Sequence, residues 1–172
     1  MDKQEPNLKL SEAEKGWIAG IIDGEGCIGL YKGFKDRDRR RWQWMAVIQI
    51  GNTNKPLLLH TKQLCHAGAL CSNGKSGYIL RISSAKAVAN ILTEVSPYLV
   101  AKEDQGNLLL EGAKIIIKCG GVRTCHDLTP YDLRLKHIWS DLRKSKGANS
   151  AKMKNRIYQS KRLNLRPLQD LN

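Results

Sequence analysis

The clearest pattern in the chain is the alternation between Trp42 and Ile50, in which one face is entirely apolar and the other carries Gln43, Met45, Val47 and Gln49. A period of two places every second side chain on the same face, so this stretch is predicted to be a β-strand with one buried face. The stretch from Cys27 to Phe34 alternates in the same way, and a charged turn separates the two. They are therefore predicted to pair as a β-hairpin.

A second hairpin is predicted further along the chain. The segments Ala69–Asn73 and Tyr78–Ser83 flank a turn that begins with Asn-Gly, a frequent hairpin turn. Leu80 and Ile82 share the apolar phase of the second segment, and Arg81 takes the opposite one. The two hairpins are predicted to form one curved, four-stranded antiparallel sheet.

Helical patterns surround the predicted strands. Ser11 and Glu14 form a capping box before an apolar run, which predicts a helix from Ser11 to Asp23. Apolar residues at helical spacing predict further helices at residues 54–66, 84–96, 102–118 and 130–144. The expected fold class is α+β, with the order αββαββα and the helices on one face of the sheet. We expect one domain over residues 1–147 and a basic tail over residues 148–172.

The charge of the chain indicates a polyanionic partner. It has 29 Lys and Arg against 16 Asp and Glu, a formal net charge of +13, which favours nucleic acid over an anionic membrane surface. No apolar run approaches the roughly 18 residues of a spanning helix, so no membrane partner is expected. The N-terminal residues lack the features of a secretion or transit signal, and the five cysteines fit reduced, buried thiols. We therefore expect an intracellular protein that is not secreted.

Three glycines in the first predicted helix indicate a close helix-to-helix contact. Gly16, Gly20 and Gly24 recur every four residues and leave one helix face without side chains, where another backbone can approach. Each glycine costs up to about 1 kcal/mol relative to alanine in a helix, so three of them need a packing reason.

Two acidic residues stand at the end of the same helix, where the helix dipole disfavours a carboxylate. Asp23 and Glu25 therefore break a local rule, as residues at functional sites often do, and carboxylates beside free carbonyl groups can bind Mg²⁺. The alternative is that Glu25 is a solvated turn residue and Asp23 an ordinary cap.

The nine residues from Ile18 to Gly26, IAGIIDGEG, resemble the motif of the LAGLIDADG homing endonucleases at every position. This resemblance implies a fold in which the motif helix packs against a second one and delivers an acidic residue to a shared active site. We find one copy of the motif in this chain, so the resemblance implies a homodimer. Its interface is expected to include Gly16, Ala19, Gly20, Asp23 and Gly24.

The resemblance also implies the catalytic residues. Glu25 of each subunit is expected to bind Mg²⁺ with help from the Gly24 carbonyl, with Mn²⁺ or Ca²⁺ as alternative occupants. Asn52 falls where relatives orient the nucleophilic water, and Lys102 falls where they place a lysine near the scissile phosphate. Relatives often carry a basic residue at the position that is Pro56 here; Lys55 is either its substitute or a solvated lysine at a helix start.

The outward face of the sheet is the expected DNA-binding surface, because a strand platform can lie along a major groove. The alternative for the charged turn is a solvated loop. A two-fold dimer implies a pseudo-palindromic duplex of about two helical turns. The predicted base contacts are Tyr31, Lys35, Arg41, Gln43, Gln49, Asn73 and Arg81, and the predicted phosphate contacts are Lys32, Arg37, Arg39, Arg40 and Lys75.

The function implied is site-specific cleavage of double-stranded DNA by an intron- or intein-type homing endonuclease. Some proteins of this family are instead RNA maturases, which would make an intron RNA a partner, or DNA-binding proteins that do not cut. Glu25 and Lys102 favour cleavage. A ribosomal RNA-binding protein would explain the charge but not the glycines or the Asp-Gly-Glu-Gly end of the helix.

Overall fold

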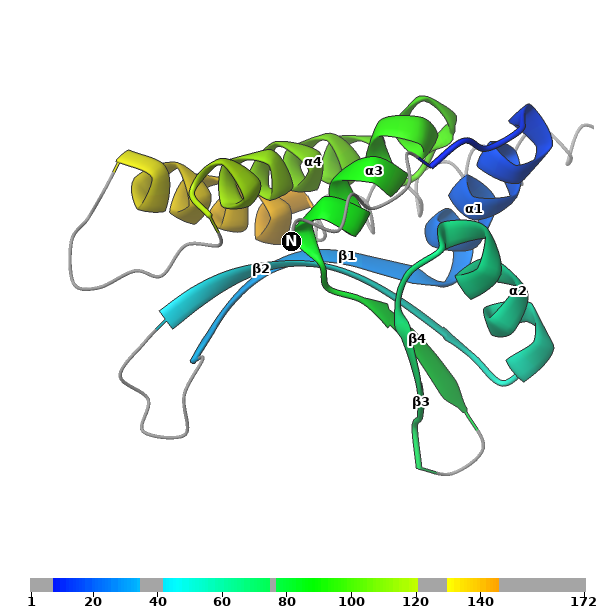
Figure 1. The fold of residues 1–172 in the computed structure, drawn as a ribbon. Coiled ribbons are helices and arrows are strands. Elements are labelled where there is room, and N and C mark those ends of the chain that lie inside the picture. The colour runs from blue at the N-terminus through cyan, green and yellow to red at the C-terminus, as the bar shows by residue number, and fades with distance from the viewer. Residues whose placement is uncertain (1–7, 35–41, 75–76, 121–129, 146–172) are drawn as a thin grey trace, which may run out of the picture.

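The structure, a computed structural model, describes residues 8–34, 42–74, 77–120 and 130–145. Within them a four-stranded antiparallel sheet carries helices on one face, which confirms the predicted α+β fold (Figure 1). The predicted basic tail, residues 148–172, lies outside the described residues.

In chain order the elements are α1 (Glu12–Glu25), β1 (Gly26–Phe34), β2 (Trp42–Asn52), α2 (Lys55–Cys65), β3 (Ala69–Ser72), β4 (Tyr78–Ile82), α3 (Ala85–Val95), the 3₁₀ helix η1 (Ser96–Tyr98), α4 (Glu103–Lys118) and a helix at residues 130–145.

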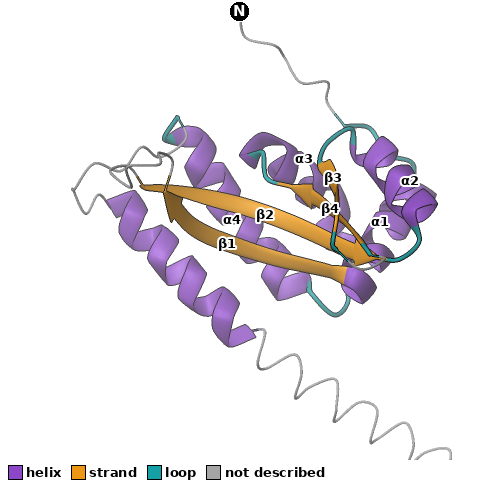
Figure 2. Cartoon of the chain, turned by 90° about the horizontal axis from the view of Figure 1, so that it is seen from below, coloured by secondary structure: helices purple, strands orange, loops and turns teal. Residues whose placement is uncertain are grey.

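The strands lie in the order β1-β2-β4-β3, so the first and third strands form the edges. The sheet is arched, with α3 and α4 over its convex side, and none of the described helices covers the concave side (Figure 1). Seen from below, β1 and β2 cross in front of α4, and the 130–145 helix lies beside β1 (Figure 2). In the described part of the chain, the helices therefore lie on one face of the sheet.

The start of α1 is fixed by the predicted capping box. The Ser11 hydroxyl accepts a hydrogen bond of 3.4 Å from the Glu14 backbone N–H, and the Glu14 carboxylate accepts one of 2.8 Å from the Ser11 N–H. The helix runs two residues past the predicted end at Asp23, because the Gly26 N–H still donates to the Ile22 carbonyl. A β-carbon at Gly26 would lie 2.6 Å from that oxygen, so only glycine permits the direct passage into β1.

The core forms between the convex face of the sheet and the helices. Alternate strand residues supply it, as the period of two predicted. From the helix side, Gly112 of α4 lets Leu30, Leu135 and Ile138 approach one point, which joins the sheet, α4 and the 130–145 helix. The strand residues in this core are Ile28, Leu30, Trp44, Ala46, Ile48, Ile50, Leu80 and Ile82.

The burial of the apolar residues in the 130–145 helix and of the cysteines is uneven, and the cysteines differ from the expectation of buried thiols. In the 130–145 helix, Leu135, Ile138 and Leu142 are buried, but Leu133 and Trp139 remain 45% and 38% exposed, because they lie off the face that packs on the sheet. Of the described cysteines only Cys65 is buried, and burial raises its pKa to about 12. The others lie at partly or fully exposed positions.

Candidate active site and nucleic-acid interface

Asp23, near the end of α1, binds the segment that leads into α4. Its carboxylate accepts hydrogen bonds from the backbone N–H groups of Val100 (2.7 Å), Ala101 (3.1 Å) and Lys102 (2.9 Å). The start of α4 has no side-chain cap of its own, since its N-cap residue is Lys102. Asp23, from another helix, binds the N–H of this N-cap residue and of the two residues before it, and its negative charge suits the positive end of the α4 dipole.

The side chain of Lys102 in turn binds the end of α1. Its Nζ donates a hydrogen bond of 2.9 Å to the Ile22 carbonyl and a second one to the Asp23 carbonyl. The last turn of α1 carries no basic residue, so this ammonium group stabilises the negative end of the helix. Burial lowers the pKa of Lys102, and the negative charges of Asp23 and Glu25 partly oppose that effect. The two residues form what we call the Asp23–Lys102 clamp.

Glu25 is the last residue of α1 and is exposed. Within the described part of the chain, no group donates a hydrogen bond to its carboxylate or forms an ion pair with it. Lys102 is close enough to interact with it electrostatically. Glu25 therefore presents free carboxylate oxygens beside a positive charge, whereas the carboxylate of Asp23 is committed within the subunit.

Asn52 lies at the same edge of the sheet as Glu25. The register pairs Gly26 with Ile50, so Glu25 lies one position and Asn52 two positions beyond that pair, at the same end of the two strands. The Asn52 side-chain oxygen accepts a hydrogen bond of 2.8 Å from the Asn54 N–H at the turn into α2. The fold thus brings the three predicted catalytic residues to one end of α1 and the sheet, with Asn52 held by a local turn.

Lys55 stands at the start of α2, next to Pro56. Its Nζ lies 5.5 Å from the ring centroid of Tyr78, within the range of a cation–π contact. Tyr78 pairs with Asn52 across β2 and β4, so this contact holds Lys55 near Asn52, at the same end of the strands. Sequence reasoning missed Tyr78, because no local pattern links it to Lys55.

No described residue of the subunit covers the glycine face of α1, which Gly16, Gly20 and Gly24 form. Gly16, Gly20 and Gly24 are exposed, and a β-carbon added at any of them would meet no described atom within 4 Å. Beside them Trp17 is 41% exposed and packs edge-on against His60, with ring centroids 5.4 Å apart. Sequence reasoning did not select Trp17 as a surface residue.

Two residues predicted at the dimer interface are engaged within the subunit instead. Ala19 is 1% exposed and belongs to the core, on the side of α1 that also buries Ile18 and Ile22. Asp23 is occupied by the backbone before α4, as described above. Among the predicted interface residues, the three glycines are the ones that this subunit leaves exposed.

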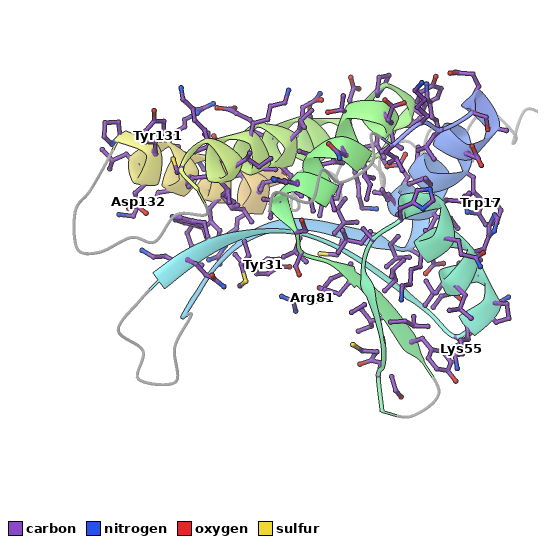
Figure 3. All side chains as sticks on the ribbon, viewed as in Figure 1. Trp17, Tyr31, Lys55, Arg81, Tyr131 and Asp132 are labelled. Carbon is purple, nitrogen blue, oxygen red and sulfur yellow. The ribbon has the colours of Figure 1, made fainter. Side chains whose placement is uncertain are left out.

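The concave face of the sheet carries polar side chains in the predicted phase. Tyr31 and Arg81 point away from the helices (Figure 3), and Gln43 and Gln49 share their phase. The register places Gln49 directly between Cys27 and Arg81 in a row across three strands. Asn73 is exposed just after β3. The predicted contacts Lys35, Arg37, Arg39, Arg40, Arg41 and Lys75 lie outside the described residues.

Lys32 does not lie on this face. It pairs with Trp44 in the sheet, and its Nζ lies 5.6 Å from the Trp44 ring centroid on the helix side. The reason is the period of two, which separates Lys32 from the phase of Tyr31. A phosphate contact by Lys32 therefore stays a prediction, and it would be made from the helix side of β1.

Over the described ranges, no helix is long and apolar enough to cross a membrane.

The shape of the chain resembles solved LAGLIDADG homing endonucleases. The homing endonuclease I-CvuI with uncleaved target DNA in the presence of Mg matches with a TM-score of 0.58 and 15% identity, over 76% of this chain and 95% of that one. I-SmaMI, bound to uncleaved DNA with calcium ions, matches with a TM-score of 0.63 and 19% identity, over 79% and 46%. The LAGLIDADG homing endonuclease I-GzeII in complex with its DNA target matches with a TM-score of 0.57 and 18% identity, over 72% and 42%.

This chain thus spans nearly all of the I-CvuI chain and less than half of the other two. A scan against protein-family models and a search of curated proteins found no match. The chain has the fold of the LAGLIDADG homing endonucleases, the family whose motif the end of α1 resembles.

Proposed function

We propose that this protein is a homing endonuclease of the intron or intein type, which acts as a homodimer and cuts both strands of a long, pseudo-palindromic DNA duplex with a divalent metal ion. The observation that carries the proposal is the position of Glu25. Its uncommitted carboxylate stands at the end of an uncovered glycine face and beside the Lys102 ammonium. Pairing of two glycine faces would bring two such carboxylates together.

The residues present fit a hard divalent cation, which prefers carboxylate and carbonyl oxygens. Glu25 and the Gly24 carbonyl are the groups expected to hold Mg²⁺, with Mn²⁺ or Ca²⁺ as alternatives. Among the described residues of one subunit, no group of three or more His, Cys, Asp or Glu comes together. A second Glu25 and phosphate oxygens would therefore have to complete the coordination. The chemistry supplied by such an ion is activation of water and neutralisation of charge on the leaving oxygen.

The other residues have distinct proposed tasks. Lys102 offsets negative charge at the scissile phosphate, and Asn52 orients water through its amide nitrogen, since its oxygen already accepts from Asn54. Lys55 supplies the basic group that Pro56 cannot. Tyr31, Gln43, Gln49 and Arg81 read bases from the concave face, because Arg and Gln can form paired hydrogen bonds with purines.

A duplex library with randomised sequence tests the proposal. Wild-type protein with Mg²⁺ is expected to cut a small set of related sequences on both strands, and Glu25→Gln is expected to bind them without cutting. Glu103→Gln, which removes an exposed carboxylate in the first turn of α4, is the matched control and should cut normally. Tight duplex binding with no cleavage by wild type would instead identify a DNA-binding protein that does not cut.

An RNA maturase is the second candidate, and the shared fold with DNA-bound endonucleases does not favour it. The same proteins should be titrated with structured intron RNA as competitor. Preferential binding of the RNA over every duplex in the library would replace the endonuclease proposal with the maturase.

A further inference from the structure

The Asp23–Lys102 clamp contacts Lys102 at two points, its backbone N–H and the ammonium group of its side chain. The Asp23 carboxylate accepts the backbone N–H of Lys102 at 2.9 Å, and the Asp23 carbonyl accepts the Lys102 ammonium. The two residues are separated by 79 positions in the chain. One residue of α1 therefore fixes both the point where the Lys102 side chain leaves the backbone and the position of its ammonium group.

A carboxylate is well suited to this task. It has no donor of its own, so it can accept the three convergent N–H groups of residues 100–102 without repulsion. Hydrogen bonds to an ionised acceptor are also about twice as strong as neutral ones. An asparagine at this position would turn an NH₂ group toward at least one of those donors, and the segment would have to move.

We infer that Asp23 is a positioning residue that acts through Lys102 and is neither a metal ligand nor a dimer contact. This inference rests on the proposed function, because Lys102 is the residue placed at the scissile phosphate. It assigns separate roles to the two acids of the motif: Glu25 faces the substrate, and Asp23 fixes the lysine beside it.

Single-turnover cleavage separates this role from a purely structural one. Asp23→Asn is expected to lower the cleavage rate by about 10- to 100-fold, the scale of a displaced reacting group, with target affinity and dimerisation unchanged within about twofold. Asp104→Asn removes a charge from the first turn of the same helix without touching Lys102 and should cut at the wild-type rate. Equal rates for Asp23→Asn and wild type would overturn the inference.

A double-mutant cycle tests whether Asp23 acts through Lys102. In the Lys102→Met background, Asp23→Asn should cause no further loss, because the group that it positions is gone. If the double variant is slower than Lys102→Met by the full effect of Asp23→Asn, Asp23 acts independently and the inference is wrong.

A readout without DNA or metal distinguishes failure of this inference from failure of the proposed function. In NMR spectra, Asp23→Asn should accelerate hydrogen exchange of the residue 100–102 amides and of the Lys102 Nζ protons, whereas Asp104→Asn should leave both unchanged. Unchanged exchange in Asp23→Asn would overturn the positioning role. If wild type does not cleave, only the endonuclease proposal is wrong. The hydrogen-exchange measurement would still show whether Asp23 positions Lys102.

Discussion

The indole Nε1 of Trp44 donates a 2.8 Å hydrogen bond to the carboxylate of Asp132, a residue 88 positions further along the chain. Both side chains are buried, and Lys136 forms an ion pair of 2.9 Å with the other carboxylate oxygen. This contact fixes the first turn of the 130–145 helix against β2. The helix is thereby part of the domain core, and it supports the strand whose concave side carries Gln43 and Gln49.

Replacing Asp132 tests the strength of this contact. Asp132→Ala leaves the Trp44 N–H buried without this acceptor, so the free energy of unfolding should fall by about 2–3 kcal/mol. Asp141→Ala, on the same helix, removes only an exposed pair with Lys144 and should cost less than about 0.5 kcal/mol. Urea denaturation followed by circular dichroism measures both. Equal losses in the two variants would show that the Trp44 contact contributes little.

The same carboxylate should make stability depend on acid. Burial alone would raise the pKa of Asp132, but the hydrogen bonds from Trp44 and Lys136 outweigh it and hold the pKa below its ordinary value of 3.8. Its contribution is therefore present above the unfolded-state value and is lost as pH falls through the lower, folded-state value. The difference in unfolding free energy between wild type and Asp132→Asn should shrink from about pH 5 downward. A constant difference down to about pH 2 would contradict this assignment.

The glycine face should control dimer formation and, through it, activity. Gly20→Leu places a side chain where a partner helix would approach, so the dimer dissociation constant should rise by about 100-fold, equivalent to about 3 kcal/mol. The isolated subunit should fold normally, because the space at Gly20 is open. Lys114→Leu adds the same side chain to an exposed site on α4 and is the control. Sedimentation velocity that shows an unchanged dimer for Gly20→Leu would reject the interface.

Arg81 is expected to read a base. Arg81→Ala should reduce discrimination at one base pair in each half-site by about 1–3 kcal/mol. Arg81→Lys keeps the charge but loses the paired hydrogen bonds, so it should lose the same discrimination with little change in salt dependence. Binding to a panel of single-substitution targets gives the answer, and a uniform loss of affinity over all targets would assign Arg81 to phosphate instead.

Lys55 is expected to contact phosphate without reading sequence. Lys55→Ala should weaken all targets alike and lower the slope of log affinity against log salt by about one for each subunit. Tyr78→Phe retains the ring below the ammonium and should behave like wild type, whereas Tyr78→Leu should reproduce part of the Lys55→Ala effect. An unchanged salt slope in Lys55→Ala would mean that this lysine is only solvated.

Much of the fold could be predicted from the chain alone, because its signals are local. The capping box at Ser11 joins residues three positions apart, and the alternation from Trp42 to Ile50 states which side chains share a face. The glycines of α1 were identified in the same way, by their spacing on one helix. Periodicity and capping depend on a few neighbouring residues, so they can be recognised without knowledge of the rest of the structure.

The partners of the charged residues could not be predicted in this way. The sequence gives no sign that Asp23 binds the backbone at Val100 or that Lys32 lies over Trp44, because both contacts join segments far apart along the chain or on neighbouring strands. The resemblance implies an interface position for Ala19, whereas the packing around α1 places its side chain in the core of the subunit.

The amino-acid sequence by itself determined the elements, the phase of each strand and the bare helix face. Only the tertiary structure decided which distant backbone N–H groups Asp23 binds and therefore where Lys102 lies. The physical reason is that a carboxylate binds whichever donors the folded chain brings within about 3 Å, and that proximity is set by the packing of segments far apart in sequence.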